Sequence, residues 1–499
     1  MTGVQTCALP ISSENNLRSD HPERRAPRIS NVTAALVWFR NDLRLADHPA
    51  LLAGLGSGRT VVPVYVLDDE SEGIRPAGAA SRWWLHHSLQ ALDASLRTLG
   101  SRLILRRGAA QKVLEKLAAE CDASAIYWNR AYDQGGRERD ERIKKGFERH
   151  GLVAESLKGN LLFEPWEVRT AANGDFKVFT AFWRACRSLP SPGEPLPAPK
   201  NLRPPERWPE SDKVADWKLL PTAPDWAGGL RATWTPGEAA ARQRLEHFLD
   251  DALPRYREAR DLPAETGTSR LSPHLAFGEV SPRRIWHAAM LRGPSAATDK
   301  FLSEIGWREF SYSLLFHHGN LAARNFRPEF DAFPWADEEP VIEAWRRGRT
   351  GYPIVDAGLR ELWTTGWMHN RVRMIVASFL TKDLLIDWRT GERWFWDTLV
   401  DADPANNAMG WQWVAGCGAD AAPYFRIFNP VLQGKKFDPQ GDYVRRWVPE
   451  LGRLPANTIH EPWTAAQQLP ADIYPTRIVD HATARDRALR AFRSLKQAA

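Results

Sequence analysis

Residues 366–429 read GWMHNRVRMIVASFLTKDLLIDWRTGERWFWDTLVDADPANNAMGWQWVAGCGADAAPYFRIFN, and their pattern decides how the C-terminal half of the chain folds. Apolar side chains recur over 371–386 with a helical period, which predicts a core-facing stripe of Val372, Ile375, Val376, Phe379 and Leu380. Successive residues advance by about 100°, so the opposite side carries Asn370, Arg373, Met374 and Ala377. An amide, a guanidinium and a thioether on one face indicate a pocket lining.

The second half of this stretch contains VDADPANNAMGWQW at 400–413. Asp401 and Asp403 stand two residues apart and precede Asn407, Trp411 and Trp413. A capped helix start beside a tryptophan-rich core explains this pattern as well as a binding site does. Local spacing does not separate the two interpretations.

Composition limits the class of protein. The chain has 499 residues, which suits two or three domains. Its 67 basic and 61 acidic residues give a net charge of +6, which permits a nucleic-acid partner without requiring one. The 23 tryptophans indicate large aromatic cores or a use of indole in stacking or electron transfer.

The sequence indicates neither a membrane protein nor a metalloprotein. No apolar run reaches the roughly 18 residues of a membrane span, so we expect no membrane partner. The cysteines lie far apart without a CxxC pair, so we expect no metal and no disulfide framework; they are Cys7, Cys121, Cys186 and Cys417.

The first residues have an unusual origin. Residues 1–11, MTGVQTCALPI, match a translated sequencing-library adapter and do not resemble a signal peptide. Residues 12–31 are polar and rich in Arg and Pro. We interpret residues 1–33 as an artefactual or disordered leader and assign no function to them.

An α/β domain is predicted for residues 34–165. Amphipathic segments there alternate with short apolar runs, at 35–39, 61–67, 102–106 and 125–129. Strands alternating with helices predict a Rossmann-like parallel sheet. Neither a GxGxxG motif nor a Walker sequence follows the first run, so the sequence gives only weak support for a dinucleotide-binding site or a P-loop.

A connector and a helical domain follow. Residues 189–226 hold too many prolines for a helix or a central strand, which predicts a connector over 166–235. Helical periods dominate from 236 to 499, which predicts a larger all-α domain there.

Two polar segments of the helical domain are candidate sites. ETGTSRLSPHLAFGEVSPR at 265–283 offers hydroxyls and backbone N–H groups that can cradle a phosphate, although a plain capping turn would look the same. EIGWREF at 304–310 places Glu304, Trp307 and Arg308 on nearby helical positions. A surface ion pair beside a core tryptophan explains the second segment equally well.

Taken together, these segments resemble the photolyase/cryptochrome family, most closely its bacterial cyclobutane pyrimidine dimer (CPD) DNA photolyases. WFRNDLRLADHPAL near the start, the two polar segments, GYPIVDAGLRELWTTGWMHNRVRMI and DADPANNAMGWQW through APYFRIFNP occur in the family's order. The resemblance implies an antenna domain, a connector and a helical catalytic domain that binds FAD. It also implies a deoxyribodipyrimidine photolyase, in which reduced FAD donates an electron under blue light to split the dimer in UV-damaged DNA.

Residue roles follow from the resemblance. FAD phosphates would be held by Tyr256, Thr268, Ser269, Arg270, Leu271 and Ser272. Arg308, Asp401, Asp403 and Asn407 would line the rest of the cofactor site, with Arg373 paired to Asp403 and Asn407 facing flavin N5. An electron would reach the flavin along Trp335, Trp388 and Trp411.

The DNA side is implied in the same way. The residues expected to contact the lesion or its phosphates are Arg260, Glu304, Trp307, Asn370, Arg371, Met374 and Trp413, and Glu304 and Asn407 are expected to act in catalysis. Members that repair (6-4) photoproducts place histidines where Asn370 and Met374 stand. Neither an amide nor a thioether titrates near neutral pH, so we predict cyclobutane dimers as the substrate.

The antenna site departs from the family pattern. Folate-binding members carry an Asn-Glu pair where this chain has Gly135 and Gly136, and a Cys-Lys pair near 321–324, where it has LAAR. We favour 5,10-methenyltetrahydrofolate over a deazaflavin or an empty site.

The alternative function is a cryptochrome-like blue-light photoreceptor, which predicts a long C-terminal extension, whereas few residues follow Leu451 here. We also expect a monomer in the bacterial cytoplasm.

Overall fold

The structure is a computed structural model that describes residues 33–421, 425–465 and 473–498. The predicted leader, apart from Thr33, and the first three residues of the APYFRIFNP motif lie outside the described residues. From Thr33 onward the chain forms one compact unit.

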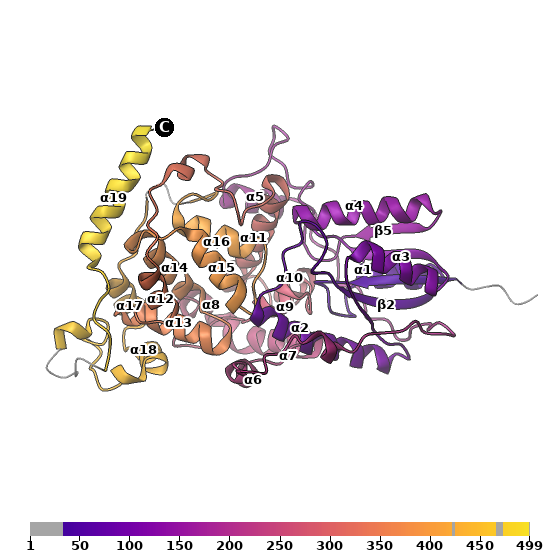
Figure 1. Cartoon of the computed structure of the whole chain (residues 1–499), viewed down its shortest axis with the longest axis horizontal. Coiled ribbons are helices and arrows are strands. Elements are labelled where there is room, and N and C mark those ends of the chain that lie inside the picture. Colours follow the sequence, from indigo (N-terminus) through magenta and orange to yellow (C-terminus); the bar gives the residue numbers. More distant parts are fainter. Residues whose placement is uncertain (1–32, 422–424, 466–472, 499) are drawn as a thin grey trace, which may run out of the picture. The chain divides into compact units, whose positions relative to one another are not determined.

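A five-stranded parallel sheet forms the N-terminal part (Figure 1). The strand order is β3-β2-β1-β4-β5, and the strands are β1 (Ala34–Phe39), β2 (Thr60–Leu67), β3 (Ile104–Arg107), β4 (Ala123–Asn129) and β5 (Val153–Leu157). The four predicted apolar runs form the first four strands, and the predicted α/β fold is confirmed. Central β1 pairs with β2 through Trp38 and Val64 and with β4 through Trp38 and Trp128.

Helices cover both faces of this sheet. They are α1 (Pro49–Gly56), α2 (Ala79–Thr98), α3 (Ala110–Glu120) and α4 (Gln134–Arg149). Every residue of β1 is buried, as expected for the centre of a parallel sheet. Val37 packs in the core beside α2, whereas Leu36 packs in the core beside α3 and α4.

The proline-rich stretch forms little regular structure, as predicted. Before it lies α5 (Phe179–Ser188); within it is one short 3₁₀ turn (Val214–Trp217), and α6 (Gly228–Thr233) follows it. The proposed domain limits at 165 and 235 remain an interpretation of the sequence.

The C-terminal part is helical, which confirms the predicted all-α region. Its α-helices are α7 (Glu238–His247), α8 (Tyr256–Ala259), α9 (Ser272–Ala276), α10 (Pro282–Met290), α11 (Ala296–His318), α12 (Glu339–Arg346), α13 (Pro353–Thr365), α14 (Asn370–Ser378), α15 (Trp388–Thr398), α16 (Asn406–Ala415), α17 (Pro430–Phe437), α18 (Asp442–Trp447) and α19 (His481–Ala498). Within the described residues, no helix combines the length and apolarity needed to cross a bilayer.

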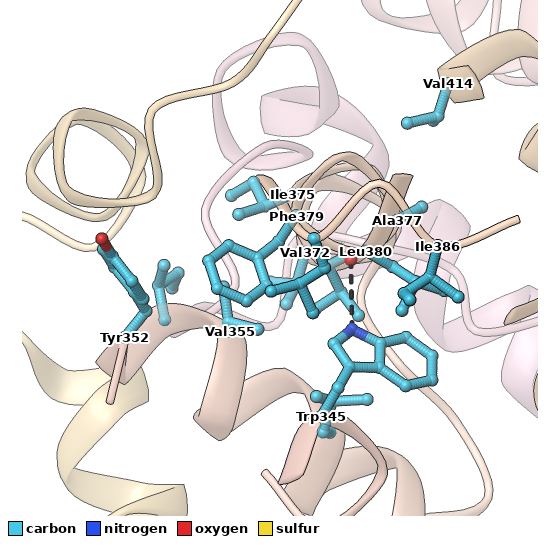
Figure 2. Close-up of a cluster of buried hydrophobic side chains, with 14 of the residues drawn as sticks. Trp345, Tyr352, Val355, Val372, Ile375, Ala377, Phe379, Leu380, Ile386 and Val414 are labelled. Carbon is cyan, nitrogen blue, oxygen red and sulfur yellow. Dashed lines mark hydrogen bonds between the residues drawn. The ribbon is translucent and has the colours of Figure 1, made fainter. Parts of the chain in front are cut away.

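The core of the helical part forms around α14, as its sequence period predicts. Val372, Ile375, Phe379 and Leu380 are at most 1% exposed and pack together (Figure 2). The indole N–H of Trp345 donates to the Val376 carbonyl at 3.4 Å, which anchors α12 on α14. The predicted single helix over 371–386 instead changes after Ser378 to a π-helical turn, η5 (Phe379–Asp383). This packing orients the polar face of α14 away from the core.

Candidate functional site

A cavity of about 520 Å³ lies among α8, α9, α11, α14, α15 and α16. The polar face of α14 lines it, as predicted, through Asn370, Arg373, Met374 and Ala377. Other predicted residues on its wall are Tyr256, Arg260, Ser269, Leu271, Ser272, Glu304, Trp307, Arg308, Arg371, Asp401, Asp403, Asn407, Trp411 and Trp413. Segments more than 150 residues apart in sequence therefore converge on one site. Thr268, Arg270, Trp335 and Trp388 do not line it.

The predicted pairing of Arg373 with Asp403 is wrong. The Arg373 guanidinium instead donates to both Asp401 oxygens, at 3.1 and 2.8 Å, and its Nε donates to the Met368 carbonyl at 2.7 Å. Asp401 is buried, so this cation supplies the counter-charge that a buried carboxylate requires.

Asp403 has a different set of donors because it caps α16. Its Oδ1 accepts from the backbone N–H groups of Ala405 and Asn406, at 2.9 and 2.8 Å. Its Oδ2 accepts from the Tyr312 hydroxyl at 2.6 Å. The interpretation of the DADPANN segment as a capped helix start is therefore correct for Asp403, and the cavity interpretation is also correct, since Asp403 reaches the wall.

The amide of Asn407 has a defined orientation. Its Nδ2 donates to the backbone carbonyl of Glu392 at 3.0 Å and to the Glu392 carboxylate at 2.9 Å. Both partners are acceptors, so an amide turned by 180° would place Oδ1 against two oxygens. The carbonyl Oδ1 of Asn407 is therefore the atom left to face the cavity, and the wall presents an acceptor at this point.

Ion pairs form the rim of the cavity. Glu304 accepts from Arg260 and lies 2.8 Å from Lys300 Nζ. Arg371 forms a pair with Asp261 at 3.0 Å. Burial acts to raise the pKa of Asp261, but the hydrogen bond and charge of Arg371, with the charge of Arg260, hold that pKa below its usual value. The positive charges of Arg260, Lys300 and Arg371 on the rim are thus partly neutralised by Glu304 and Asp261.

The polar loop before α9 contributes only part of its predicted set. Ser269, Leu271 and Ser272 reach the cavity wall. Arg270 adopts a positive φ of 49° and stacks on Trp367 at 4.7 Å. Burial and the nearby charge of Arg446 lower the pKa of Arg270, although Glu361 opposes them. The Arg270 guanidinium therefore lies over the Trp367 ring and does not line the cavity.

The EIGWREF segment lies within α11. Trp307 stacks on Phe179 with ring centroids 3.8 Å apart, which fixes one apolar wall. Glu309 faces away from the cavity, where its Oε2 accepts from the backbone N–H groups of Leu162 and Phe163 at 2.8 and 3.1 Å. Burial raises the pKa of Glu309 to about 7, against the opposing charge of Arg308.

The three predicted relay tryptophans differ in burial. Trp411 is on the cavity wall and 2% exposed. Trp388 is fully buried, and its indole N–H donates to Asn325 at 2.9 Å. Trp335 is half-buried, and its neighbour Ala336 donates to the Leu385 carbonyl at 2.7 Å, which brings its segment to the start of α15. Of the three rings, Trp411 lines the cavity and Trp335 is the most exposed.

Several site residues were not predicted from the sequence. Lys300 lies one helical turn before Glu304, so an i,i+4 search would have found it. Tyr312 lies on α11 and Glu392 on α15, and only the fold shows their partners, Asp403 and Asn407. No cluster of three or more metal-ligating side chains occurs among the described residues.

The position of the family's Asn-Glu pair is filled by backbone. A Cβ on residue 135 would lie 2.1 Å from the Gly73 carbonyl oxygen. The LAAR segment donates no side chain of the expected type, and the carbonyls of Leu321 and Arg324 instead accept from Gln412. The side chains expected in folate-binding members therefore have no counterparts at these two positions.

Comparison with known proteins assigns this architecture to a class. Residues 35–200 match the model for DNA photolyase, and residues 301–494 match the model for the FAD binding domain of DNA photolyase. The fold and the cavity are thus those of the two-part class that contains photolyases and cryptochromes.

The relatives identify the family. A deoxyribodipyrimidine photo-lyase of Agrobacterium fabrum is 52% identical over 472 residues, which cover 93% of this chain and 98% of that protein. Cryptochrome-1 of Arabidopsis thaliana is 41% identical over 449 residues, which cover 87% of this chain and 65% of that protein. The crystal structure of a bacterial class III photolyase from Agrobacterium tumefaciens superposes with a TM-score of 0.91 at 51% identity, covering 95% of this chain and 100% of that one. The chain belongs to the DNA photolyase family.

Proposed function

We propose that this protein is a deoxyribodipyrimidine photolyase, a light-driven lyase that splits cyclobutane pyrimidine dimers in UV-damaged DNA. The observation that carries the proposal is the cavity, whose wall contains residues expected to bind the cofactor and residues expected to bind the lesion. The 52% identity to a deoxyribodipyrimidine photo-lyase supports the same function.

The residues present fit FAD. A cavity of about 520 Å³ is in the size range of cofactor sites, and it combines hydroxyls, a guanidinium and an apolar wall. Ser269 and Ser272 would hold the phosphates, and Tyr256 and Leu271 would close that end. Arg373, held by Asp401, would place positive charge beside the flavin, and Asn407 would offer its carbonyl to a flavin N–H. When bound, reduced FAD supplies the electron that opens the dimer under light.

The tryptophans Trp411, Trp388 and Trp335 would carry an electron inward from the surface. The cavity position of Trp411 and the partial exposure of Trp335 support this role, because the innermost member must contact the cofactor and the outermost must exchange electrons with solvent. Core packing remains the alternative for each ring.

The lesion pocket would lie on the same wall. Trp307 and Trp413 supply rigid apolar surfaces, since Trp307 is stacked on Phe179 and the Trp413 indole N–H donates to the Asp420 carbonyl at 3.0 Å. Asn370 and Met374 border the site without any group that titrates near neutral pH. Splitting a cyclobutane ring needs no proton donor, whereas transferring a group in a (6-4) photoproduct does, which favours the cyclobutane substrate.

DNA binding would use the rim. Arg260, Arg371 and Lys300 lie where an extruded dinucleotide would bring its phosphates, so affinity should fall with salt. We further propose that the protein acts as a monomer in the cytoplasm, where bacterial DNA is found.

A light-harvesting second chromophore is part of the proposal. Methenyltetrahydrofolate remains the favoured candidate, with a deazaflavin as the alternative. Because Gly135 packs on Gly73, neither chromophore would be held here by the Asn-Glu pair of other family members, and folate would bind in an altered pose.

Photorepair of defined lesions tests the function. The reduced protein is mixed with oligonucleotides that carry either a thymine cyclobutane dimer or a (6-4) photoproduct, illuminated with blue light, and assayed for restored bases. Rapid repair of the dimer alone is expected. Repair of neither lesion, with a normal flavin spectrum, would favour the photoreceptor alternative suggested by the 41% identity to Cryptochrome-1, and repair of the (6-4) product alone would overturn the roles of Asn370 and Met374.

A further inference from the structure

Arg75, in the α/β part, contacts Glu392, the residue that accepts from Asn407 on the cavity wall. Arg75 lies between β2 and α2 and is about one-third exposed on its side chain (34%). Its Nη1 donates to Glu392 Oε1 at 2.7 Å, and its Nη2 donates to Oε2 at 3.0 Å. Its guanidinium lies 4.0 Å over the ring of Trp396, whose indole N–H donates to the Pro76 carbonyl at 2.9 Å. Two-point pairing and stacking together fix its position.

Arg75 is the charged partner of Glu392. The Glu392 side chain is 2% exposed, and a buried carboxylate needs a cation or several donors beside it. Among the described residues, its side-chain oxygens accept from Arg75 and the Asn407 amide. Of these two, only Arg75 carries a charge.

The position of the Glu392 side chain in turn helps to decide which end of the Asn407 amide faces the cavity. Glu392 Oε1 and the Glu392 backbone carbonyl both accept from the NH₂ group of Asn407, which leaves Oδ1 toward the cavity. Without Arg75, the Glu392 carboxylate would lose the two-point contact that holds it in place. The Asn407 NH₂ group would then lose one of its two fixed acceptors, and the amide would be free to reorient.

We infer that Arg75 is a positioning residue, which holds the Asn407 carbonyl toward the flavin by fixing the Glu392 carboxylate that accepts from the Asn407 NH₂ group. The α/β part of the chain thereby sets the polarity of one group on the cofactor wall. This inference rests on the proposed use of the cavity for FAD, since an acceptor there favours the reduced flavin, which carries an N–H at N5.

The reduction equilibrium of the bound flavin, measured without DNA, tests the inference. We compare wild type with Arg75→Met, Arg75→Lys and the matched control Arg393→Met. Arg393 is exposed on the same helix as Glu392 and donates to Thr390. Its replacement removes one positive charge but leaves the contacts among Arg75, Glu392 and Asn407 intact. At a fixed potential, the ratio of reduced to oxidised flavin should fall about tenfold in Arg75→Met, the effect of losing roughly 1.4 kcal/mol. It should fall less in Arg75→Lys and hardly at all in the control.

A double-mutant cycle separates positioning from a general structural role. Glu392→Gln should lower the ratio by itself, and adding Arg75→Met to it should change nothing further, because the arginine acts through the carboxylate. Additive effects, or equal shifts in Arg75→Met and Arg393→Met, would overturn the inference. If Arg75→Met does not fold, Arg75→Lys with and without Glu392→Gln gives the same comparison.

A second readout does not require the cofactor. The side-chain NH₂ of Asn407, followed by NMR in ¹⁵N-labelled protein, should exchange slowly with solvent in wild type and several-fold faster in Arg75→Met. Unchanged exchange would contradict the inference even in flavin-free protein. Loss of FAD binding or of repair in the wild type would instead contradict the proposed function, and since neither measurement here uses DNA, the two failures are distinguishable.

Discussion

The indole of Trp411 lies so close to Gly391 of α15 that a Cβ on residue 391 would stand 2.1 Å from the ring. No real Cβ approaches an aromatic carbon so closely, so any larger residue must displace the ring or the helix. The glycine thus allows α15, which carries Trp388, to lie directly against Trp411 on α16.

Gly391→Ala should therefore destabilise the protein by about 1–3 kcal/mol, the usual cost of overpacking a core, and should slow flavin photoreduction. Thermal unfolding and flash-induced reduction of the oxidised flavin measure the two effects. Gly56→Ala is the control, because nothing lies within 4 Å of a Cβ on that residue of α1. Wild-type stability in Gly391→Ala would contradict this expectation, because it would mean that the Trp411 ring and α15 can move apart without a loss of stability.

Trp411→Phe should slow photoreduction of the oxidised flavin by roughly tenfold or more, because phenylalanine is much harder to oxidise than tryptophan. Protein already reduced with dithionite should repair dimers at the normal rate, since the relay is not needed once the flavin is reduced. Trp286→Phe, which changes a buried tryptophan of α10 away from the cavity wall, is the matched control. Normal photoreduction in Trp411→Phe would remove this residue from the relay.

Glu304→Ala should lower kcat for dimer repair, by roughly tenfold, more than it weakens DNA binding. A hydrogen bond to the dimer that strengthens as charge arrives would stabilise the transition state more than the bound substrate. The substitution also frees Arg260 and Lys300 from their shared carboxylate, so affinity for DNA should hold or rise and depend more steeply on salt. Glu304→Gln, which keeps the hydrogen-bonding capacity but not the charge, serves as the comparison. A large rise in KM with kcat unchanged would contradict the role.

Glu309→Gln should remove a pH-dependent loss of stability. Burial raises the pKa of this carboxyl from 4.5 to about 7, so between these pH values the folded protein binds more protons than the unfolded chain. Stability conferred by the protonated form is therefore lost as pH rises from about 4.5 to about 7. The amide keeps an acceptor for Leu162 and Phe163 without a charge, so at pH 8 the variant should exceed wild type by on the order of 2 kcal/mol, with little difference at pH 4. Urea unfolding across this pH range measures the gain, and the exposed Glu148→Gln is the control. An equal offset at every pH would mean that Glu309 is not protonated in the fold.

Sequence periodicity was sufficient for much of the fold. The buried strands β1 to β4 are apolar runs, and the stripe on α14 follows from its helical period. β5 was missed because VAESL is short and partly polar, with Val153 and Glu155 exposed at the edge of the sheet. The π-helical turn after Ser378 was also missed, because it changes the hydrogen-bond register without interrupting the apolar pattern.

The candidate site was predictable where its residues lie in compact motifs. The resemblance supplied most of the cavity wall, but it paired Arg373 with the wrong carboxylate, because only the fold shows that Asp403 caps α16. The contact of Arg75 with Glu392 spans 317 positions, and no local pattern relates two such residues.

The backbone contact between Gly73 and Gly135 sets a limit on redesign of this protein. An engineer who wished to transplant the Asn-Glu pair of other family members could not do so by point substitution, because the first new side chain would collide with a carbonyl oxygen. The loop that carries Gly73 would have to be shortened or rerouted first. A transplant of that pair would therefore have to redesign two segments that lie far apart in the sequence, because a substitution at residue 135 requires a backbone movement at residue 73.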